Sequence, residues 1–234
     1  MVDEKDSNFT SSLETLLLPL DKGLHIGSWG QVQEWKLDLD TQNDTHRHLS
    51  ELIGWYPGWS IASYQGGYGN STIQQAVATT LWSRGVGIED ANSGWEKVWR
   101  SACWARLNET ERAYYELRLS IQNNWAPNGL SMYSGHSEPF QIDANFGFVG
   151  AVLSMLVVDM PMLDYRDSTR TVVLGPAIPS DWANGSVKGL RLRGGGSVDF
   201  SWDDDGVVTK ATLDCGSNKV KVINKNGDVL GSSE

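Results

Sequence analysis

Asp143 is the carboxylate that its local context marks most strongly for chemistry. It lies in Pro-Phe-Gln-Ile-Asp-Ala-Asn-Phe-Gly at residues 139–147, just ahead of the apolar run at residues 149–156. Two interpretations are open from these residues. Asp143 either caps a helix by accepting a backbone N–H, or it is a catalytic or ligand-orienting carboxylate at a loop-to-helix junction beside a cleft.

Other polar side chains with suitable chemistry stand elsewhere in the chain. Glu34 is a second carboxylate, flanked by the amide of Gln33 and by a tryptophan, and His136 stands just before the Asp143 motif. Glycosidic hydrolysis needs an acid that protonates the leaving oxygen and a carboxylate that activates water or attacks. These residues make hydrolysis of a sugar linkage one candidate chemistry.

The segment Thr-His-Arg-His-Leu at residues 45–49 adds two imidazoles and a guanidinium. It is either a solvated turn with satisfied side chains or, within an aromatic-rich loop, a place where Arg47 and His48 hold a ligand. His46 and His48 alternate as metal ligands do, but no third ligand stands at a recognisable spacing. We expect no metal.

Composition favours a globular protein with a neutral or small polar ligand. The 234 residues are 40% hydrophobic, which is enough for a buried core. The net charge of −10 comes from scattered acidic residues and argues against nucleic acid and anionic membranes as partners. No apolar run reaches the roughly 20 residues that span a bilayer. The 11 tryptophans and seven tyrosines either fill the core or stack on sugar rings.

Signals for the compartment point in two directions. Asn-x-Ser/Thr sequons favour a secreted protein with exposed loops, and they occur at Asn8, Asn43, Asn70, Asn108 and Asn184. Residues 1–6 are polar, and no apolar signal segment follows them. We therefore expect either an intracellular protein or a piece of a longer chain. Cys103 and Cys215 are either free or paired.

The elements that position these residues are expected to be helices first and strands last. Apolar periodicity and cap signals predict helices from Ser11 or Ser12 to residue 18, and at residues 71–84, 95–107, 111–122 and 146–158. The region 20–65 is loop-rich. After Pro161, period-two patterning predicts a small antiparallel set at residues 172–174, 187–193, 198–202, 207–213 and 219–223.

These elements predict a mainly α protein with a C-terminal β part. We place the helical domain at residues 1–163 and the β domain at residues 164–234. Helices separated by Gly- and aromatic-rich loops are expected of an α/α toroid or bundle with its ligand site at the loop end. The β part is too small to be independent, so we expect it to pack on the helices.

Taken together, the short motifs resemble glycoside hydrolase family 95. They are Gln-x-Gln-Glu-Trp at 31–35, His-Arg-His-Leu-Ser at 46–50, Leu-x-Gly-x-Tyr-Pro-Gly at 52–58, Ala-Arg-Leu at 105–107, Arg-Ala-Tyr at 112–114, the Asp143 motif at 139–147 and Gly-Ser-Val-Lys-Gly-Leu-Arg-x-Arg-Gly-Gly at 185–195. They cover about residues 16 to 213 in collinear order. The resemblance implies an inverting, exo-acting α-L-fucosidase, or an α-L-galactosidase, with an (α/α)6 barrel followed by a β domain.

The resemblance also implies roles for single residues. Asp143 resembles the aspartate that polarises an asparagine, which then acts as the base on the attacking water. Arg47 and His48 resemble sugar-binding residues, and Glu34 and Gln33 lie in a motif near the site. His136 stands one place further from Pro139 than the family's histidine does.

Some family residues have no counterpart in this sequence. The general acid of the family belongs to an upstream Ser-Pro-Glu-Asn segment, and neither that segment nor the catalytic asparagine pair occurs here. Ala144 and Phe148 replace small residues that are usual in the family, which narrows or reshapes the pocket. The chain therefore resembles the second half of the barrel and the β domain.

Our expectation is a C-terminal fragment of a secreted-type α-L-fucosidase that acts without a cofactor on terminal fucose of glycans. The upstream part of the same enzyme is its expected partner, and the fragment alone is expected to be inactive. The alternative, from another class, is a catalytically inert carbohydrate-binding protein or pseudoenzyme. An α-L-galactoside is the alternative substrate.

Overall fold

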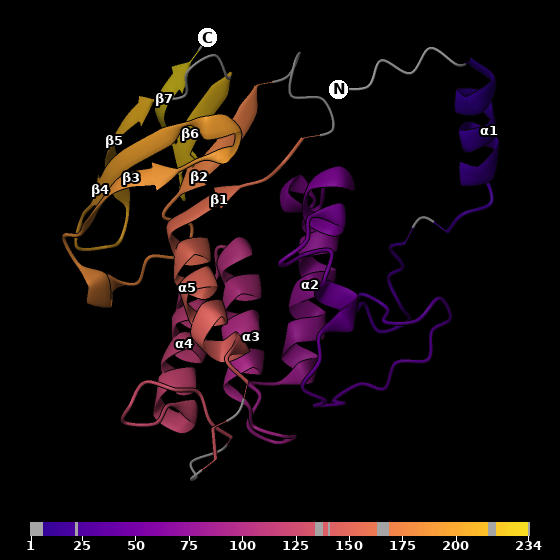
Figure 1. Cartoon of the computed structure of the whole chain (residues 1–234), viewed down its shortest axis with the longest axis horizontal. Helices are drawn as coiled ribbons and strands as arrows, with labels where there is room; N and C mark the ends of the chain where they lie inside the picture. Colours follow the sequence, from indigo (N-terminus) through magenta and orange to yellow (C-terminus); the bar gives the residue numbers. More distant parts are fainter. Residues whose placement is uncertain are drawn as a thin grey trace.

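The computed structural model describes residues 7–21, 23–133, 138–139, 141–162, 169–214 and 219–233. The candidate site residue His136 and the cysteine Cys215 lie outside the described residues. Helices make up the first part of the described chain and strands the last part, as the sequence predicts (Figure 1). The helices are α1 (Ser7–Leu17), α2 (Ser71–Arg84), α3 (Gly94–Arg106), α4 (Thr110–Asn124) and α5 (Asp143–Leu156).

The ends of the helices differ from the predictions where capping decides them. α2 spans the predicted residues, but the Oδ1 atom of Asn70 caps it by accepting from the backbone N–H of Thr72 at 3.0 Å. α1 begins at Ser7 instead of at Ser11 or Ser12. The Ser12 hydroxyl donates to the carbonyl of Asn8 at 2.8 Å, so it bonds within the helix and does not start it.

α3 is the central helix of the described chain. It packs against α4 and α5, and it buries not only apolar residues but also Glu96, Lys97 and Arg100, which have no exposed surface. Gly147 of α5 lies against it, since a Cβ atom there would meet a Val98 methyl group at 2.6 Å. Glycine therefore sets how closely α5 approaches α3.

The strands form two sheets that share one core. The strands are β1 (Val157–Asp159), β2 (Arg170–Leu174), β3 (Ser186–Arg191), β4 (Ser197–Trp202), β5 (Val208–Asp214), β6 (Val220–Asn224) and β7 (Val229–Ser233). The first sheet has the order β1-β2-β6-β7 and the second β3-β4-β5. β2 and β6 pair in parallel, which corrects the prediction of a wholly antiparallel set. The chain passes through the second sheet between these two strands, and such a crossover permits a parallel pair.

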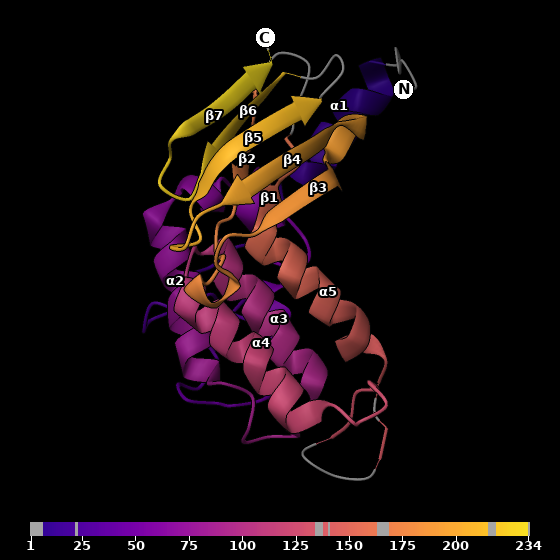
Figure 2. The same ribbon diagram turned by 90° about the vertical axis from the view of Figure 1, so that its left-hand side faces the viewer.

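The β part packs on the end of the helices, as predicted (Figures 1 and 2). Trp182 contacts Tyr114 of α4 with ring centroids 5.9 Å apart. The Arg193 guanidinium lies 4.7 Å from the centre of the Trp59 ring. α5 runs directly into β1, so the helix that begins at Asp143 ends at the sheet.

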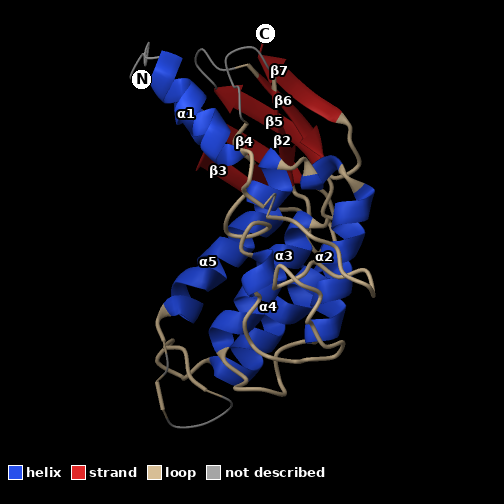
Figure 3. Cartoon of the chain, turned by 90° about the vertical axis from the view of Figure 1, so that its right-hand side faces the viewer, coloured by secondary structure: helices blue, strands red, loops and turns tan. Residues whose placement is uncertain are grey.

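α1 stands apart from the other helices at the right of Figure 1, and in Figure 3, which is seen from that side, it overlaps the strands. Its side chains are exposed, including Leu13, Leu16 and Leu17. None of the helices in the described part of the chain is both long and apolar enough to cross a membrane.

Candidate active site

Asp143 is the first residue of α5 and lies at the rim of an apolar pocket. The pocket has a volume of about 470 Å³. Besides Asp143, its lining residues are Ile53, Tyr56, Pro57, Trp95, Val98, Trp99 and Gly147. They come from the loop before α2, from one face of α3 and from the start of α5.

The structure does not support the helix-cap interpretation of Asp143. The residue before the first turn of α5 is Ile142, and no side chain caps this described helix end. Asp143 instead lies within the first turn, where its charge complements the positive end of the helix dipole. Its side chain is exposed and faces the pocket, so it is accessible to a ligand.

The loop wall of the pocket is held from behind by α3. The Trp99 indole N–H donates to the Tyr56 carbonyl at 2.7 Å. The Arg106 guanidinium lies 4.8 Å from the centre of the Tyr56 ring and donates to the Gly58 carbonyl at 2.8 Å. Burial raises the pKa of the Tyr56 hydroxyl, so this lining side chain is uncharged near neutral pH.

A row of aromatic rings connects the His-Arg-His segment with this pocket. His46 and His48 have ring centroids 4.8 Å apart, His48 and Trp95 are 5.2 Å apart, and Trp95 and Trp99 are 6.3 Å apart. Desolvation of His48 lowers its pKa, and the charges of His46 and Arg47 lower it further. His48 is therefore a neutral imidazole at neutral pH and offers both a hydrogen-bond donor and an acceptor.

Arg47 is fixed beside this row by residues that the sequence did not single out. Its Nη1 atom lies 2.9 Å from the Oδ2 atom of Asp90, and its backbone N–H donates to the same oxygen at 3.1 Å. The buried Arg100 donates to the Arg47 carbonyl at 3.4 Å. Hydrogen bonds from Arg47 lower the pKa of the Asp90 carboxyl.

Glu34 and Gln33 lie in a different cluster and do not line the Asp143 pocket. The Nη2 atom of Arg84 lies 2.9 Å from the Glu34 carboxylate, and the same guanidinium contacts Glu51 at 3.0 Å and Asp44 at 3.1 Å. The Gln33 backbone N–H donates to a loop carbonyl at 2.9 Å. Arg84 is the last residue of the helix predicted at residues 71–84, and nothing in its local sequence signals that it gathers three carboxylates.

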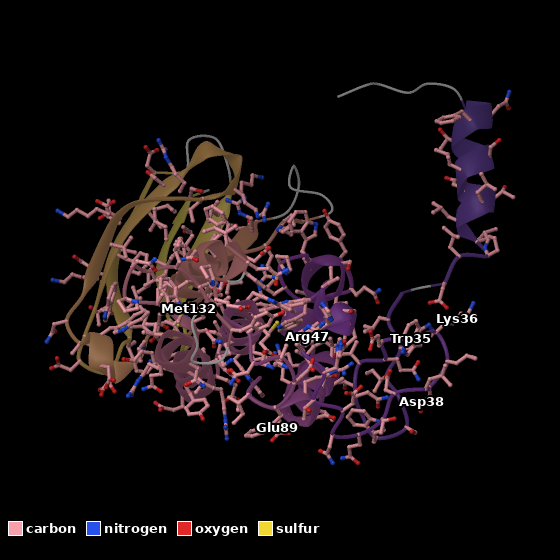
Figure 4. All side chains as sticks on the ribbon, turned by 60° about the horizontal axis from the view of Figure 1, so that its bottom comes forward. Trp35, Lys36, Asp38, Arg47, Glu89 and Met132 are labelled. Atoms are coloured by element: carbon pink, nitrogen blue, oxygen red, sulfur yellow. The ribbon has the colours of Figure 1, made fainter. Side chains whose placement is uncertain are left out.

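Figure 4 shows where the sequence neighbours of Glu34 lie relative to Arg47. Arg47 lies toward the middle of the molecule, whereas Trp35 and Asp38, the neighbours of Glu34 in sequence, lie on a loop at its side. The charge of Glu34 still acts on His48, where it opposes the lowering of the pKa. In the described ranges, no cluster of three or more His, Cys, Asp or Glu residues has the arrangement of a metal site.

An exposed carboxylate at an aromatic pocket, with a fixed guanidinium and an imidazole beside it, is an arrangement suited to a sugar. The chain belongs to glycoside hydrolase family 95. Residues 1–156 match the Glycosyl hydrolase family 95 catalytic domain, and residues 168–231 match the Glycoside hydrolase family 95, C-terminal domain. The family expected from the motifs is confirmed.

Three curated relatives are named as fucosidases. The chain is 61% identical to "Probable alpha-fucosidase A" of Aspergillus oryzae (strain ATCC 42149 / RIB 40), over 97% of this chain and 32% of the relative. It is 59% identical to "Probable alpha-fucosidase A" of Aspergillus niger (strain ATCC MYA-4892 / CBS 513.88 / FGSC A1513), over 90% of this chain and 27% of the relative. It is 37% identical to "Alpha-L-fucosidase 2" of Arabidopsis thaliana, over 78% and 21%. The chain thus spans about a third or less of these relatives.

Proposed function

We propose that this chain is the C-terminal part of an inverting, exo-acting α-L-fucosidase that removes terminal fucose from glycans without a cofactor. The observation that carries the proposal is the position of Asp143 at the rim of the pocket to which the row from His46 to Trp99 leads. The names of the relatives support fucose as the sugar.

In the complete enzyme, Asp143 orients an asparagine that acts as the base on the attacking water. The general acid and that asparagine come from the upstream part of the protein. Arg47 and His48 hold sugar hydroxyls, because their donors and acceptors lie beside the pocket and suit a neutral polyol. Gln33 and Glu34 contribute to substrate binding from outside the Asp143 pocket, and His136 is a further substrate-binding residue in this proposal.

The helices α2 to α5 belong, in this proposal, to the second half of an (α/α)6 barrel made from residues 1–163, with a β domain at residues 164–234. A row of apolar side chains on α5 and on the residue before it supports the proposal: Ile142, Phe146, Val149 and Leu153 are 53%, 74%, 57% and 40% exposed. Their spacing places them on one face of the helix. A contiguous apolar face of this kind marks an interaction surface, and the upstream half of the barrel would cover it.

The test is the substitution Asp143→Asn in the complete enzyme. We expect turnover of an aryl α-L-fucoside to fall by at least about a thousandfold, as for loss of a group that acts only in the transition state. The KM is expected to stay within about threefold. Asp214→Asn, at an exposed position on β5, is the matched control and leaves the rate unchanged. A near wild-type rate for Asp143→Asn would contradict the catalytic role proposed for Asp143.

Two further measurements define the reaction. The anomer first released, followed by NMR, is the β-sugar if the enzyme inverts an α-linkage. A parallel assay on aryl α-L-galactoside tests the alternative substrate, because a lower kcat/KM there than on the fucoside is expected of a fucosidase.

A second candidate is an inert carbohydrate-binding protein. It is favoured by one observation: among the described residues that line the pocket, Asp143 is the only carboxylate. Parallel assays of the 234-residue chain and of the complete protein distinguish the two candidates. Fucose binding without turnover in both the chain and the complete protein supports the inert candidate, whereas turnover in the complete protein supports the enzyme.

We also propose that the protein is a secreted glycoprotein. All five sequon asparagines are exposed in the structure, so an oligosaccharide has access to each of them. Treatment of the secreted protein with an amidase that removes Asn-linked glycans would lower its apparent mass. An unchanged mass, or recovery only from cell contents, would contradict this proposal.

A further inference from the structure

We infer that Asp90 is a positioning residue that holds the Arg47 guanidinium in its sugar-binding orientation; the inference rests on the proposed function. Asp90 lies on the loop between α2 and α3. Its Oδ2 atom accepts from Arg47 twice, from the backbone N–H at 3.1 Å and from Nη1 at 2.9 Å. One oxygen thus ties the side chain of Arg47 to its own backbone, which restricts the torsions between them.

The backbone of Arg47 is held from the other side by α3. The Arg100 Nη1 atom donates to the Arg47 carbonyl at 3.4 Å, and its Nε atom donates to the Gly85 carbonyl at 3.0 Å. The Arg100 side chain has no exposed surface, and Glu96 contacts it at 3.2 Å. Asp90 therefore controls the remaining freedom of Arg47, which is the direction of its side chain.

The engaged atoms leave part of the Arg47 guanidinium for a ligand. In the described structure, Asp90 occupies Nη1, while Nε and Nη2 remain for other acceptors. Two parallel N–H groups of a guanidinium suit two neighbouring oxygens, such as adjacent hydroxyls of a sugar ring. The His48 ring contacts the ring of Trp95, which lines the pocket. In this proposal Arg47, the residue before His48, presents its remaining donors to the same ligand.

Stability alone does not explain this contact. The Arg47 and Asp90 side chains are 33% and 32% exposed, and ion pairs at such exposure contribute little to folding. Their value lies in orientation, since a pre-positioned arginine loses less rotamer freedom when the sugar binds. Removal of the Asp90 charge is expected to change sugar affinity more than unfolding.

Glu89 is a matched control, because it is the adjacent residue with the same charge. It is exposed (labelled in Figure 4), and none of the side-chain hydrogen bonds or ion pairs found among the described residues involves it. Glu89→Gln and Asp90→Asn remove the same charge at almost the same distance from the pocket. Any difference between them comes from the hydrogen bonds to Arg47.

The experiment uses the complete enzyme with four variants: Asp90→Asn, Glu89→Gln, Arg47→Ala and the double variant Asp90→Asn/Arg47→Ala. We expect Asp90→Asn to lower kcat/KM roughly tenfold, mainly through a higher KM, as for loss of a charge-assisted hydrogen bond. Glu89→Gln stays within about twofold of wild type, and both keep the wild-type melting temperature. The double variant resembles Arg47→Ala, because Asp90 acts only through Arg47.

Three results of these assays would overturn the inference, and a crystal structure can supply a fourth. The first is that Asp90→Asn and Glu89→Gln change kcat/KM equally. The second is that the effects of Asp90→Asn and Arg47→Ala on kcat/KM multiply in the double variant. The third is that activity falls only because folded protein is lost. A crystal structure of the Asp90→Ala variant reads the orientation of Arg47 without an activity assay, and an unmoved guanidinium there also refutes it. If wild type fails to cleave the fucoside while Arg47 turns away in that variant, the proposed function fails and the positioning role stands.

Discussion

Glu116 gives the sharpest prediction about stability, because it is an acid buried where its charge is poorly tolerated. It lies on α4 and is 2% exposed. Burial raises its pKa from 4.5 to about 8, although the nearby charges of Arg100 and Lys97 oppose the shift. Among the residues that the structure describes, its Oε2 atom finds no hydrogen-bond partner. The folded protein therefore keeps Glu116 protonated at neutral pH, whereas the unfolded chain releases that proton.

The sign of the pH dependence follows from these two pKa values. Below pH 4.5 both states hold the proton and Glu116 contributes no pH dependence. Between pH 4.5 and about 8 only the folded state holds it, so raising the pH favours the unfolded state. At about 1.4 kcal/mol per pH unit, stability falls by roughly 3 kcal/mol between pH 4.5 and pH 7 on account of this group.

The perturbation that tests this is Glu116→Gln, since glutamine matches the shape of the protonated acid but does not titrate. We expect the variant to be about as stable as wild type at pH 5 and more stable at pH 8. The assay is denaturant unfolding at half-unit steps of pH, with Glu111→Gln as control because Glu111 is exposed on the same helix. Parallel stability curves for wild type and Glu116→Gln between pH 5 and pH 8 would refute the reasoning.

Three more predictions follow from packing. Gly147→Ala places a Cβ atom 2.6 Å from a Val98 methyl group and lowers unfolding stability by about 1–3 kcal/mol, whereas Gly231→Ala, with open space around it, does not; melting temperatures compare them. Burial raises the pKa of the Cys103 thiol to about 12, so mass spectrometry finds this residue unmodified by iodoacetamide in the native protein and alkylated in urea. Phe146→Ser lowers the stability of the complete enzyme by about 3 kcal/mol but hardly affects the 234-residue chain; equal responses would contradict a covered α5 face.

Strong local sequence signals predicted most of the helices and strands, whereas weak signals gave wrong positions for some of their ends. The period of α2 is visible in its own sequence, so its limits were predicted correctly. β1 was predicted to continue the preceding helix, because Val157 and Val158 extend its apolar run. In the structure these β-branched residues pair with β2, since pairing with a strand is a tertiary contact that periodicity does not contain. β7, which contains Gly231, was missed for the same reason.

The residues of the candidate site also differ in how well local sequence predicts them. Asp143, Arg47 and His48 stand in motifs and were predicted from them, although their roles stay predictions. Asp90 and Arg100 lie 43 and 53 positions from Arg47. No local pattern signals that such distant residues meet. The apolar pattern that predicts a helix at residues 95–107 says nothing of Lys97 and Arg100. In the structure α3 is covered on nearly all sides and buries both of them beside Glu96 and Glu116.

α5 connects the chemistry of the site to the question of what surrounds it. Asp143 and Phe146 are three residues apart on this helix, so their side chains lie on neighbouring parts of its surface. Phe146 is 74% exposed and Asp143 faces the pocket. A segment that covers Phe146 therefore lies next to the Asp143 carboxylate. Under the proposed function, the upstream part of the protein both completes the helical layer and supplies the asparagine on which Asp143 acts. The site is therefore complete only when this helical layer is complete.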